Sequence, residues 1–194
     1  MHTADPPERT PPGAGHSSFE LIDAGQFLAE LQLTPGLTVA DLGCGEGHYT
    51  FALADAVGEK GLVYALDLWQ PGLEALECRA AAEGRKNLKT YLANISRSIP
   101  LPDGSVDLAL MATVLHDLAE FDLADGALKE TARVLKPGGA LAIVEFKKVA
   151  GPPGPPLTVR LGPEEVAVMV APHGFKQARV REVGPYNYLT RFIK

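Results

Sequence analysis

The sequence predicts a doubly wound α/β fold, in which helices cover both faces of a mainly parallel sheet. From Leu37 onward, short apolar runs alternate with stretches in which apolar residues recur at helical spacing. Several runs, such as Leu108–Met111, are apolar at consecutive positions, as strands covered on both faces require. Only Gly184 and Pro185 separate the last two runs, which is too short for a parallel crossover, so we expect these strands to be antiparallel.

The strands and helices are expected in the order of βαβ units. The expected strands are Thr38–Leu42, Leu62–Leu66, Leu88–Leu92, Val106–Ala112, Ala140–Phe146, Phe175–Val183 and Tyr186–Ile193. The expected helices begin after Asp23 or lie around Tyr49–Ala56, Leu73–Ala80, Leu128–Leu135 and Pro163–Val170. For the helix around Leu128–Leu135, Asp122 is the expected N-cap and the Pro-Gly-Gly sequence from Pro137 is the expected end.

The length of 194 residues fits one domain. Residues 1–17 contain two Pro-Pro pairs and no apolar stripe, so they cannot bury enough surface to offset the entropy of ordering. We therefore expect a disordered Pro-rich tail over residues 1–17 and a single domain over residues 18–194.

Composition and charge narrow the class of protein. The 18 basic and 24 acidic residues give a formal net charge of −6, which argues against a nucleic-acid partner because phosphate binding depends on Lys and Arg. Cys44 and Cys78 are too few for a disulfide framework or a cysteine-based metal site. The longest apolar run, Leu108–Leu115, is far shorter than the ~20 residues of a membrane helix, and the N-terminus lacks the apolar core of a signal peptide. We expect a cytoplasmic protein without a metal.

The most informative segment is Val39–Thr50, because it joins an expected strand to an expected helix and contains glycines at 43, 45 and 47. Glycines allow a tight turn and let a ligand lie against the backbone. A turn without a ligand is one alternative. A dinucleotide site is another, but its G-x-G-x-x-G pattern requires glycine where His48 stands. Asp41, just before the turn, suits a ligand that carries a positive amino group better than one that carries a pyrophosphate.

A second acidic residue, Asp67, ends the run that begins at Leu62. In a doubly wound sheet this position lies at the carboxyl end of the neighbouring strand, beside the glycine turn. A carboxylate there can accept hydrogen bonds from two ribose hydroxyls. The alternative is that Asp67 is an ordinary loop or helix-capping residue.

Taken together, these segments resemble the class I methyltransferases that depend on S-adenosylmethionine (SAM), a ligand with an ammonium and a sulfonium but no phosphate. Asp41–Gly47 is similar to their first motif and Asp67 to their ribose-binding acid. Asn94, ahead of Ile99–Asp107, resembles the position that holds the adenine, and Arg133–Leu141 resembles their stretch before the fifth strand. The resemblance covers Leu37 to about Phe146. It implies a Rossmann-like, seven-stranded sheet of order 3-2-1-4-5-7-6, with strand 7 antiparallel.

The resemblance also implies a set of cofactor-binding residues in four parts of the chain. They are Asp41, Gly43, Cys44, Gly45, Asp67, Leu68, Asn94, Ile95, Ala112 and Thr113. Many members of the family have Asp where this chain has Asn94, whose amide oxygen is still able to accept a hydrogen bond from the adenine amino group. Cys44 is expected to be a small residue of the turn and not a nucleophile.

The segment Ala112–Asp117 follows the fourth strand, and the resemblance places it, as a loop, beside the transferable methyl group. His116 is a candidate general base, since imidazole titrates near neutral pH. The alternative is that His116 packs against the cofactor. The sequence favours this alternative because, apart from the adjacent Asp117, no orienting partner for His116 is visible at a readable spacing, and neighbouring side chains in a helix are not expected to face each other.

The predicted function is transfer of a methyl group from SAM to a small-molecule acceptor. Met111–Val114 stands where adenine-N6 and protein-glutamine methyltransferases have an Asn/Asp-Pro-Pro-Tyr/Phe motif, and arsenic methylation would need more thiols than two. Two alternatives remain: a SAM-binding sensor or partner subunit without transferase activity, and an NAD-dependent oxidoreductase. The sequence predicts neither the acceptor atom nor the oligomeric state.

Overall fold

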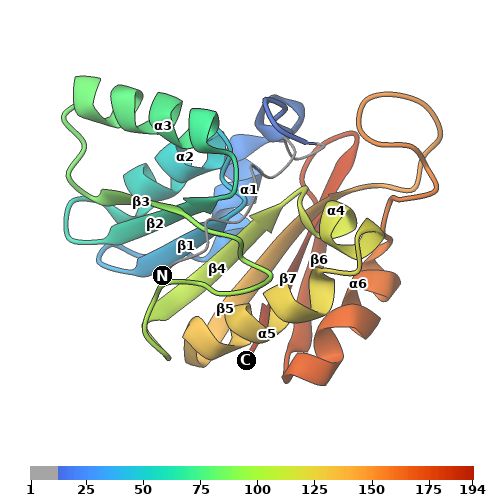
Figure 1. Ribbon diagram of the computed structural model, residues 1–194. Helices are drawn as coiled ribbons and strands as arrows, with labels where there is room; N and C mark the ends of the chain where they lie inside the picture. The colour runs from blue at the N-terminus through green and yellow to red at the C-terminus, as the bar shows by residue number, and fades with distance from the viewer. Residues whose placement is uncertain (1–12) are drawn as a thin grey trace, which may run out of the picture.

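The computed structural model describes residues 13–194, so residues 1–12 of the predicted tail lie outside the described residues. A single sheet forms the middle layer, with α1, α2 and α3 on one face and α4, α5 and α6 on the other (Figure 1). The strands are β1 Thr38–Leu42, β2 Leu62–Asp67, β3 Leu88–Leu92, β4 Val106–Ala112, β5 Leu135–Phe146, β6 Lys176–Glu182 and β7 Asn187–Ile193. The α-helices are α1 Ala24–Leu31, α2 His48–Val57, α3 Gln70–Ala82, α4 Leu115–Glu120, α5 Ala124–Val134 and α6 Pro163–Val170.

The seven strands have the order β3-β2-β1-β4-β5-β7-β6. β7 pairs antiparallel with both β5 and β6, whereas the other neighbours are parallel. This confirms the predicted fold, including the short antiparallel connection near Gly184. The middle of the sheet is apolar on both faces because two helical layers cover it: Ala40 and Leu42 pack in one core cluster and Val39 in another.

The strand order determines where a ligand is able to bind. β1 lies between β2 and β4, so the chain leaves β1 towards one side of the sheet and later returns on the other side. Parallel strands β1, β2 and β4 end at the same edge, at Leu42, Asp67 and Ala112. A crevice at such a switch point is the usual ligand site of an open α/β sheet.

The local predictions differ from the structure around β4 and β5. The segment after Ala112 is only briefly a loop, because α4 begins at Leu115 and therefore contains His116. Asp122 does not cap α5: its φ is 57°, and the N-cap is Leu123, without a side-chain hydrogen bond. The predicted helix extends one residue too far. α5 ends at Val134, and Leu135 already pairs with Val106 as the first residue of β5. Pairing with β4 draws Leu135 into the sheet, although pairing with β7 begins only at Ala140.

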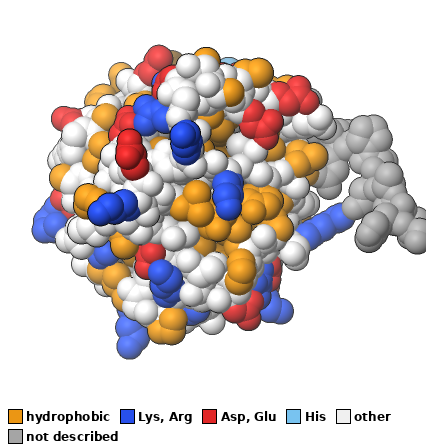
Figure 2. Space-filling view, turned by 90° about the vertical axis from the view of Figure 1, so that its left-hand side faces the viewer, with side chains coloured by type: hydrophobic (Ala, Val, Ile, Leu, Met, Phe, Trp, Pro, Cys, Tyr) orange, Lys and Arg blue, Asp and Glu red, His pale blue; other side chains and the backbone are white. Residues whose placement is uncertain are grey.

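Figure 2 shows the side of the molecule on which β3 forms the sheet edge. Hydrophobic side chains gather there in one patch, with a basic side chain lying across it, and acidic and basic side chains are scattered around. Within residues 13–194, no helix is long and apolar enough to cross a membrane.

Candidate functional site

The glycine-rich turn connects β1 to α2 in a conformation that only glycine adopts easily. Gly43, Gly45 and Gly47 have φ values of 81°, 53° and 84°. A Cβ on Gly43 would lie 2.6 Å from Cγ2 of Val114, so a side chain is excluded there. A Cβ on Gly45 would meet nothing within 4 Å, so the backbone at Gly45 faces open space. The turn is therefore tight on one side and open to a ligand on the other.

Asp67 connects the end of β2 to this turn. Its Oδ2 accepts a hydrogen bond from the backbone N–H of Gly45 at 2.7 Å, and its Oδ1 accepts one from the N–H of Trp69 at 2.7 Å. Each carboxylate oxygen keeps lone-pair capacity for a further donor. The side chain is thus held in one orientation while it remains able to accept two more hydrogen bonds.

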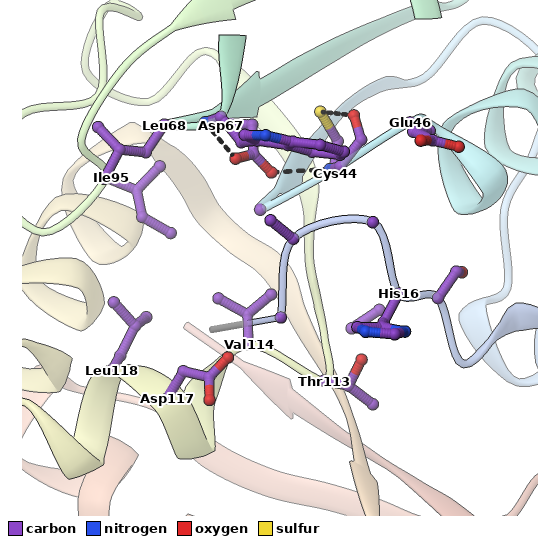
Figure 3. A pocket seen from close by; sticks show the side chains of 18 of the residues that line it. His16, Cys44, Glu46, Asp67, Leu68, Ile95, Thr113, Val114, Asp117 and Leu118 are labelled. Carbon is purple, nitrogen blue, oxygen red and sulfur yellow. Dashed lines mark hydrogen bonds between the residues drawn. The ribbon is translucent and has the colours of Figure 1, made fainter. Parts of the chain in front are cut away.

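A cavity of about 500 Å³ opens at this edge of the sheet (Figure 3). Except for Asp41, every residue of the predicted cofactor set lines it, from the turn, the end of β2, the segment after β3 and the end of β4. Thr113 lines the cavity with a φ of 56°, a strained value for a non-glycine residue of the kind that is often found at ligand sites.

Asp41 lies behind the cavity wall. It is 1% exposed, and its Oδ2 accepts a hydrogen bond from the Thr50 hydroxyl at 2.6 Å. Burial raises the pKa of Asp41 to about 7; the Thr50 hydrogen bond opposes this shift and the charge of Asp67 adds to it. The carboxylate that the sequence assigns to a positive group of the ligand is thus separated from the cavity and half neutralised near pH 7.

Asn94 lines the cavity, but its amide oxygen is already engaged. Oδ1 accepts hydrogen bonds from the N–H of Ser96 at 3.1 Å and from the Ser96 hydroxyl at 2.7 Å. Two bonds use both lone pairs of a carbonyl oxygen. Among the described residues, no partner is recorded for Nδ2 of Asn94, so the amide nitrogen is the group that remains for a ligand.

His116 does not line the cavity and is 5% exposed. Its Nδ1 lies 2.8 Å from Oε2 of Glu145, and its backbone N–H donates to Oε1 of the same carboxylate at 3.1 Å. Glu145 is completely buried at the end of β5. Glu145 is a site residue that was not predicted from the sequence, although a charged residue inside the apolar run Ala140–Phe146 is a signal that a partner must be near.

Two further parts of the cavity wall come from residues 13–17 and from the α4 side, of which only the segment up to Asp117 was expected near the methyl group. Residues 13–17 line one side, and His16 is among the lining side chains labelled in Figure 3. This segment is anchored by Ser18, whose hydroxyl lies 2.8 Å from the Tyr49 hydroxyl and 3.3 Å from that of Thr113. The α4 side supplies Val114, Asp117, Leu118, Phe121 and Leu123. These residues come from segments that no spacing rule connects to the glycine turn.

Cys44 has the environment of a structural thiol. Burial raises its pKa well above the ordinary value, and the nearby carboxylates Asp41 and Asp67 raise it further. A thiol that stays protonated is a poor nucleophile. In the part of the chain that the structure describes, no group of three or more His, Cys, Asp or Glu side chains is arranged to hold a metal ion.

The comparisons with known proteins agree with this geometry. The family described as "Methyltransferase domain" matches residues 40–143. A demethylmenaquinone methyltransferase of Lactococcus lactis is 34% identical over 110 residues, which are 57% of this chain and 42% of that protein. One of Geobacillus stearothermophilus is 33% identical over 118 residues, which are 61% of this chain and 49% of that protein. The match thus spans less than half the length of these curated relatives.

The crystal structure of a SAM-dependent methyltransferase from Aquifex aeolicus has a TM-score of 0.83 and 35% sequence identity. It covers 94% of this chain and 93% of that one, so the likeness includes the N-terminal and C-terminal segments outside the family match. The chain belongs to the class I family of SAM-dependent methyltransferases.

Proposed function

We propose that this chain binds SAM in the cavity at the carboxyl edge of the sheet and transfers its methyl group to a small-molecule acceptor. The observation that carries the proposal is the Asp67 carboxylate, held by the N–H groups of Gly45 and Trp69 beside a backbone turn that is open to the cavity. This combination suits a ribose with two free hydroxyls next to an extended amino-acid chain.

The other wall residues also fit SAM. Leu68 and Ile95 lie on the same side of the cavity in Figure 3 and offer apolar surface to a planar base. Asn94 offers an amide N–H to a ring nitrogen of that base. The open face of Gly45 leaves room for the amino-acid part of SAM. Gly43 and Cys44 line the cavity beside Gly45. A volume of about 500 Å³ lies in the ordinary range of cofactor pockets.

When bound, the sulfonium of SAM supplies a methyl group that is activated for displacement by a nucleophile. The protein itself has to hold the acceptor atom in line and exclude water, since correct positioning accounts for much of the rate in such reactions. Residues 13–17 and α4 both line the cavity away from the glycine turn, and Gly13 lies beside Asp117, so they are the walls that we assign to the acceptor.

The acceptor that we propose is a small, largely apolar molecule with an acidic hydrogen, such as a hydroquinone. Val114, Leu118, Phe121 and Leu123 form an apolar wall, and Phe121 and Leu123 are 55% and 41% exposed. Large apolar side chains left open at a cavity rim are typical of a binding surface. The relatives named as demethylmenaquinone methyltransferases support the same acceptor class.

Calorimetry with SAM, S-adenosylhomocysteine and NADH tests the cofactor. We expect a micromolar dissociation constant for SAM, about −8 kcal/mol, and no binding of NADH. Binding of NADH alone would contradict the proposal. Reduced 1,4-naphthoquinone under anaerobic conditions then serves as acceptor probe, with methylated product and S-adenosylhomocysteine measured by mass spectrometry. SAM binding without turnover on any acceptor of this class would instead favour a non-catalytic SAM-binding protein.

A further inference from the structure

Three side chains in contact, those of Glu145, His116 and Asp117, lead from the buried end of β5 to the cavity. Glu145 bonds both the backbone N–H and the ring of His116, at 3.1 Å and 2.8 Å, so it fixes the position and the orientation of the imidazole. The other ring nitrogen, Nε2, lies 3.4 Å from Oδ1 of Asp117. Asp117 lines the cavity, and in Figure 3 its carboxylate points into it. The acceptor therefore has access to Asp117, while His116 and Glu145 stay behind the wall.

The positions of the three groups give each of them a different solvation. The side chain of Glu145 is 0% exposed, that of His116 6% and that of Asp117 24%. A buried carboxylate with a hydrogen-bonded imidazole favours the protonated ring, because the positive charge compensates the buried negative one. A protonated ring in turn places a positive charge beside Asp117, whose Oδ1 lies 3.4 Å from Nε2.

Apart from His116 itself, the charged groups that shift the pKa values of His116 and Asp117 are carboxylates. Burial lowers the pKa of His116, but the hydrogen bond and charge of Glu145, together with Asp117 and Glu120, outweigh burial and raise it. Burial raises the pKa of Asp117; the charge of His116 opposes this, and those of Glu145 and Glu120 add to it. Tyr188 of β7 and Tyr49 of α2 also lie near enough for the charge of Glu145 to raise their pKa values. A carboxylate with a raised pKa is a stronger base than an exposed one.

We propose that Asp117 is the residue that takes the proton from the acceptor, and that Glu145 and His116 are positioning residues that hold Asp117 ready for it. The inference rests on the proposed methyl transfer to an acceptor with an acidic hydrogen. The O–H bond of the acceptor breaks, its proton bonds to an Asp117 oxygen, and the electron pair stays on the acceptor as the nucleophile. After product release, Asp117 returns the proton to water.

A purely structural role is the competing explanation, because Glu145 also ties α4 to β5. We call the arrangement in which Glu145 and His116 position Asp117 the relay. The histidine ring distinguishes the relay from a purely structural role, since the relay requires that Asp117 and His116 sense each other's charge. We would label the full chain with ¹⁵N-histidine, saturate it with S-adenosylhomocysteine and follow the ring nitrogens by NMR between pH 5 and 9. His116→Gln assigns the signals.

In the relay, the pKa of His116 lies above about 6.5 in the wild type and falls by about half a unit or more in Asp117→Asn, since a favourable charge is lost. Glu145→Gln should lower it further, provided that this variant folds. Glu120→Gln removes an exposed charge on the same helix that also raises the pKa of His116, so it should lower that pKa by less than Asp117→Asn does. A His116 pKa that is equal in the wild type and Asp117→Asn would overturn the relay, whether or not Glu145→Gln folds.

A second experiment measures the rate of single-turnover methylation of reduced 1,4-naphthoquinone at saturating SAM. The wild-type rate should rise with pH through the pKa of Asp117 and then level off. Asp117→Asn should lose about 100-fold in rate, with S-adenosylhomocysteine affinity within twofold of the wild type, and Asp117→Glu should restore part of the rate. His116→Gln should lose less and move the rising limb.

Failure of the proposed function and failure of the proposed role of Asp117 give different experimental results. A wild type that binds no SAM contradicts the proposed function, and one that binds SAM but does not methylate the probe contradicts the acceptor class; the NMR comparison then decides the relay. A wild type that methylates the probe while Asp117→Asn keeps its rate overturns the inference and leaves the proposed function intact.

Discussion

Oε2 of Glu145 lies 2.8 Å from Nδ1 of His116, although 29 positions separate the two residues in the sequence. Reasoning from the sequence alone favoured a packing role for His116 because no orienting partner was visible. The partner exists, but it lies on β5, the neighbour of β4 in the sheet, and not near His116 in the sequence. Since His116 also lies outside the cavity lining, its two expected roles, direct base or cofactor contact, both give way in our proposal to a positioning role.

Asp67→Asn should weaken SAM binding by about 10-fold or more, because hydrogen bonds to a charged group contribute roughly 1.5–3 kcal/mol. The amide retains the shape of the side chain but keeps only one acceptor oxygen. Asp67→Ala should weaken binding at least as much, and more than Asn94→Ala does, since Asp67 also holds the N–H groups of Gly45 and Trp69. Calorimetry measures all three variants. Wild-type affinity in both Asp67 variants would mean that Asp67 does not touch the ribose.

Asn94→Asp tests which end of the amide meets the cofactor. The oxygen of Asn94 is occupied by Ser96, so we expect the nitrogen to donate to the base. SAM affinity should then decrease in the order wild type, Asn94→Ala, Asn94→Asp, because a carboxylate would place lone pairs against a ring nitrogen. If Asn94→Asp binds SAM as well as the wild type or better, the oxygen accepts from the adenine amino group, as the family resemblance alone would suggest.

Asp41→Asn should change how stability depends on pH. The pKa of Asp41 is about 7 in the folded chain and near 3.8 when unfolded, so the folded state binds the extra proton between these values. The contribution of Asp41 to stability is therefore lost as the pH rises from about 4 to 7.

The Asn variant lacks this proton, so its free energy of unfolding relative to the wild type should improve by about 2–3 kcal/mol between pH 5 and pH 8. Urea denaturation without cofactor at both pH values measures the difference. Glu59→Gln, which changes an exposed carboxylate in the same way, serves as the control. A constant offset between Asp41→Asn and the wild type at both pH values would show that Asp41 titrates normally.

Arg160→Ala should open the loop between β5 and α6. The guanidinium of Arg160 is 3% exposed and donates to five backbone carbonyls, those of Lys147, Val149, Gly151, Pro153 and Pro155. Loss of a buried partner that serves several acceptors should cost at least about 2 kcal/mol. We expect faster cleavage of residues 149–157 by proteinase K and a lower thermal midpoint. Arg181→Ala is the control, since that side chain is half exposed; equal cleavage in both variants would contradict the role of Arg160.

Two N-terminal truncations separate the predicted tail from the cavity wall. Removal of residues 1–12 should change the thermal midpoint by less than about 2 °C, because this composition lacks an apolar stripe. Removal of residues 1–17 deletes one wall of the cavity but keeps Ser18 and its contacts with Tyr49 and Thr113. We expect SAM affinity to fall at least threefold in the longer truncation only. Equal affinity in the two proteins would show that residues 13–17 do not contribute to cofactor binding.

The sequence by itself determined the strands, the helices between them and the glycine turn, because these depend on short-range signals, whereas the strand order was implied only by the resemblance to the methyltransferase family. Apolar runs, helix periodicity and the length of each connection decide which strands are parallel, and the spacing from Gly43 to Asp67 is that of one βα unit. Most of the strand bounds agree within one residue for the same reason. The exception is β5, where pairing of Leu135 with Val106 of β4 overrides the helical periodicity.

Only the tertiary structure decided how the site is completed. Ser18 meets Thr113 across 95 positions and Glu145 meets His116 across 29, and no local pattern encodes such contacts. The same holds for the burial of Asp41 behind the cavity wall and for the engagement of the Asn94 oxygen by Ser96, which depend on packing and on side-chain orientation. Spacing identifies the elements that meet at the carboxyl edge of the sheet, but the solvation and the orientation of each polar group arise only when the layers pack together.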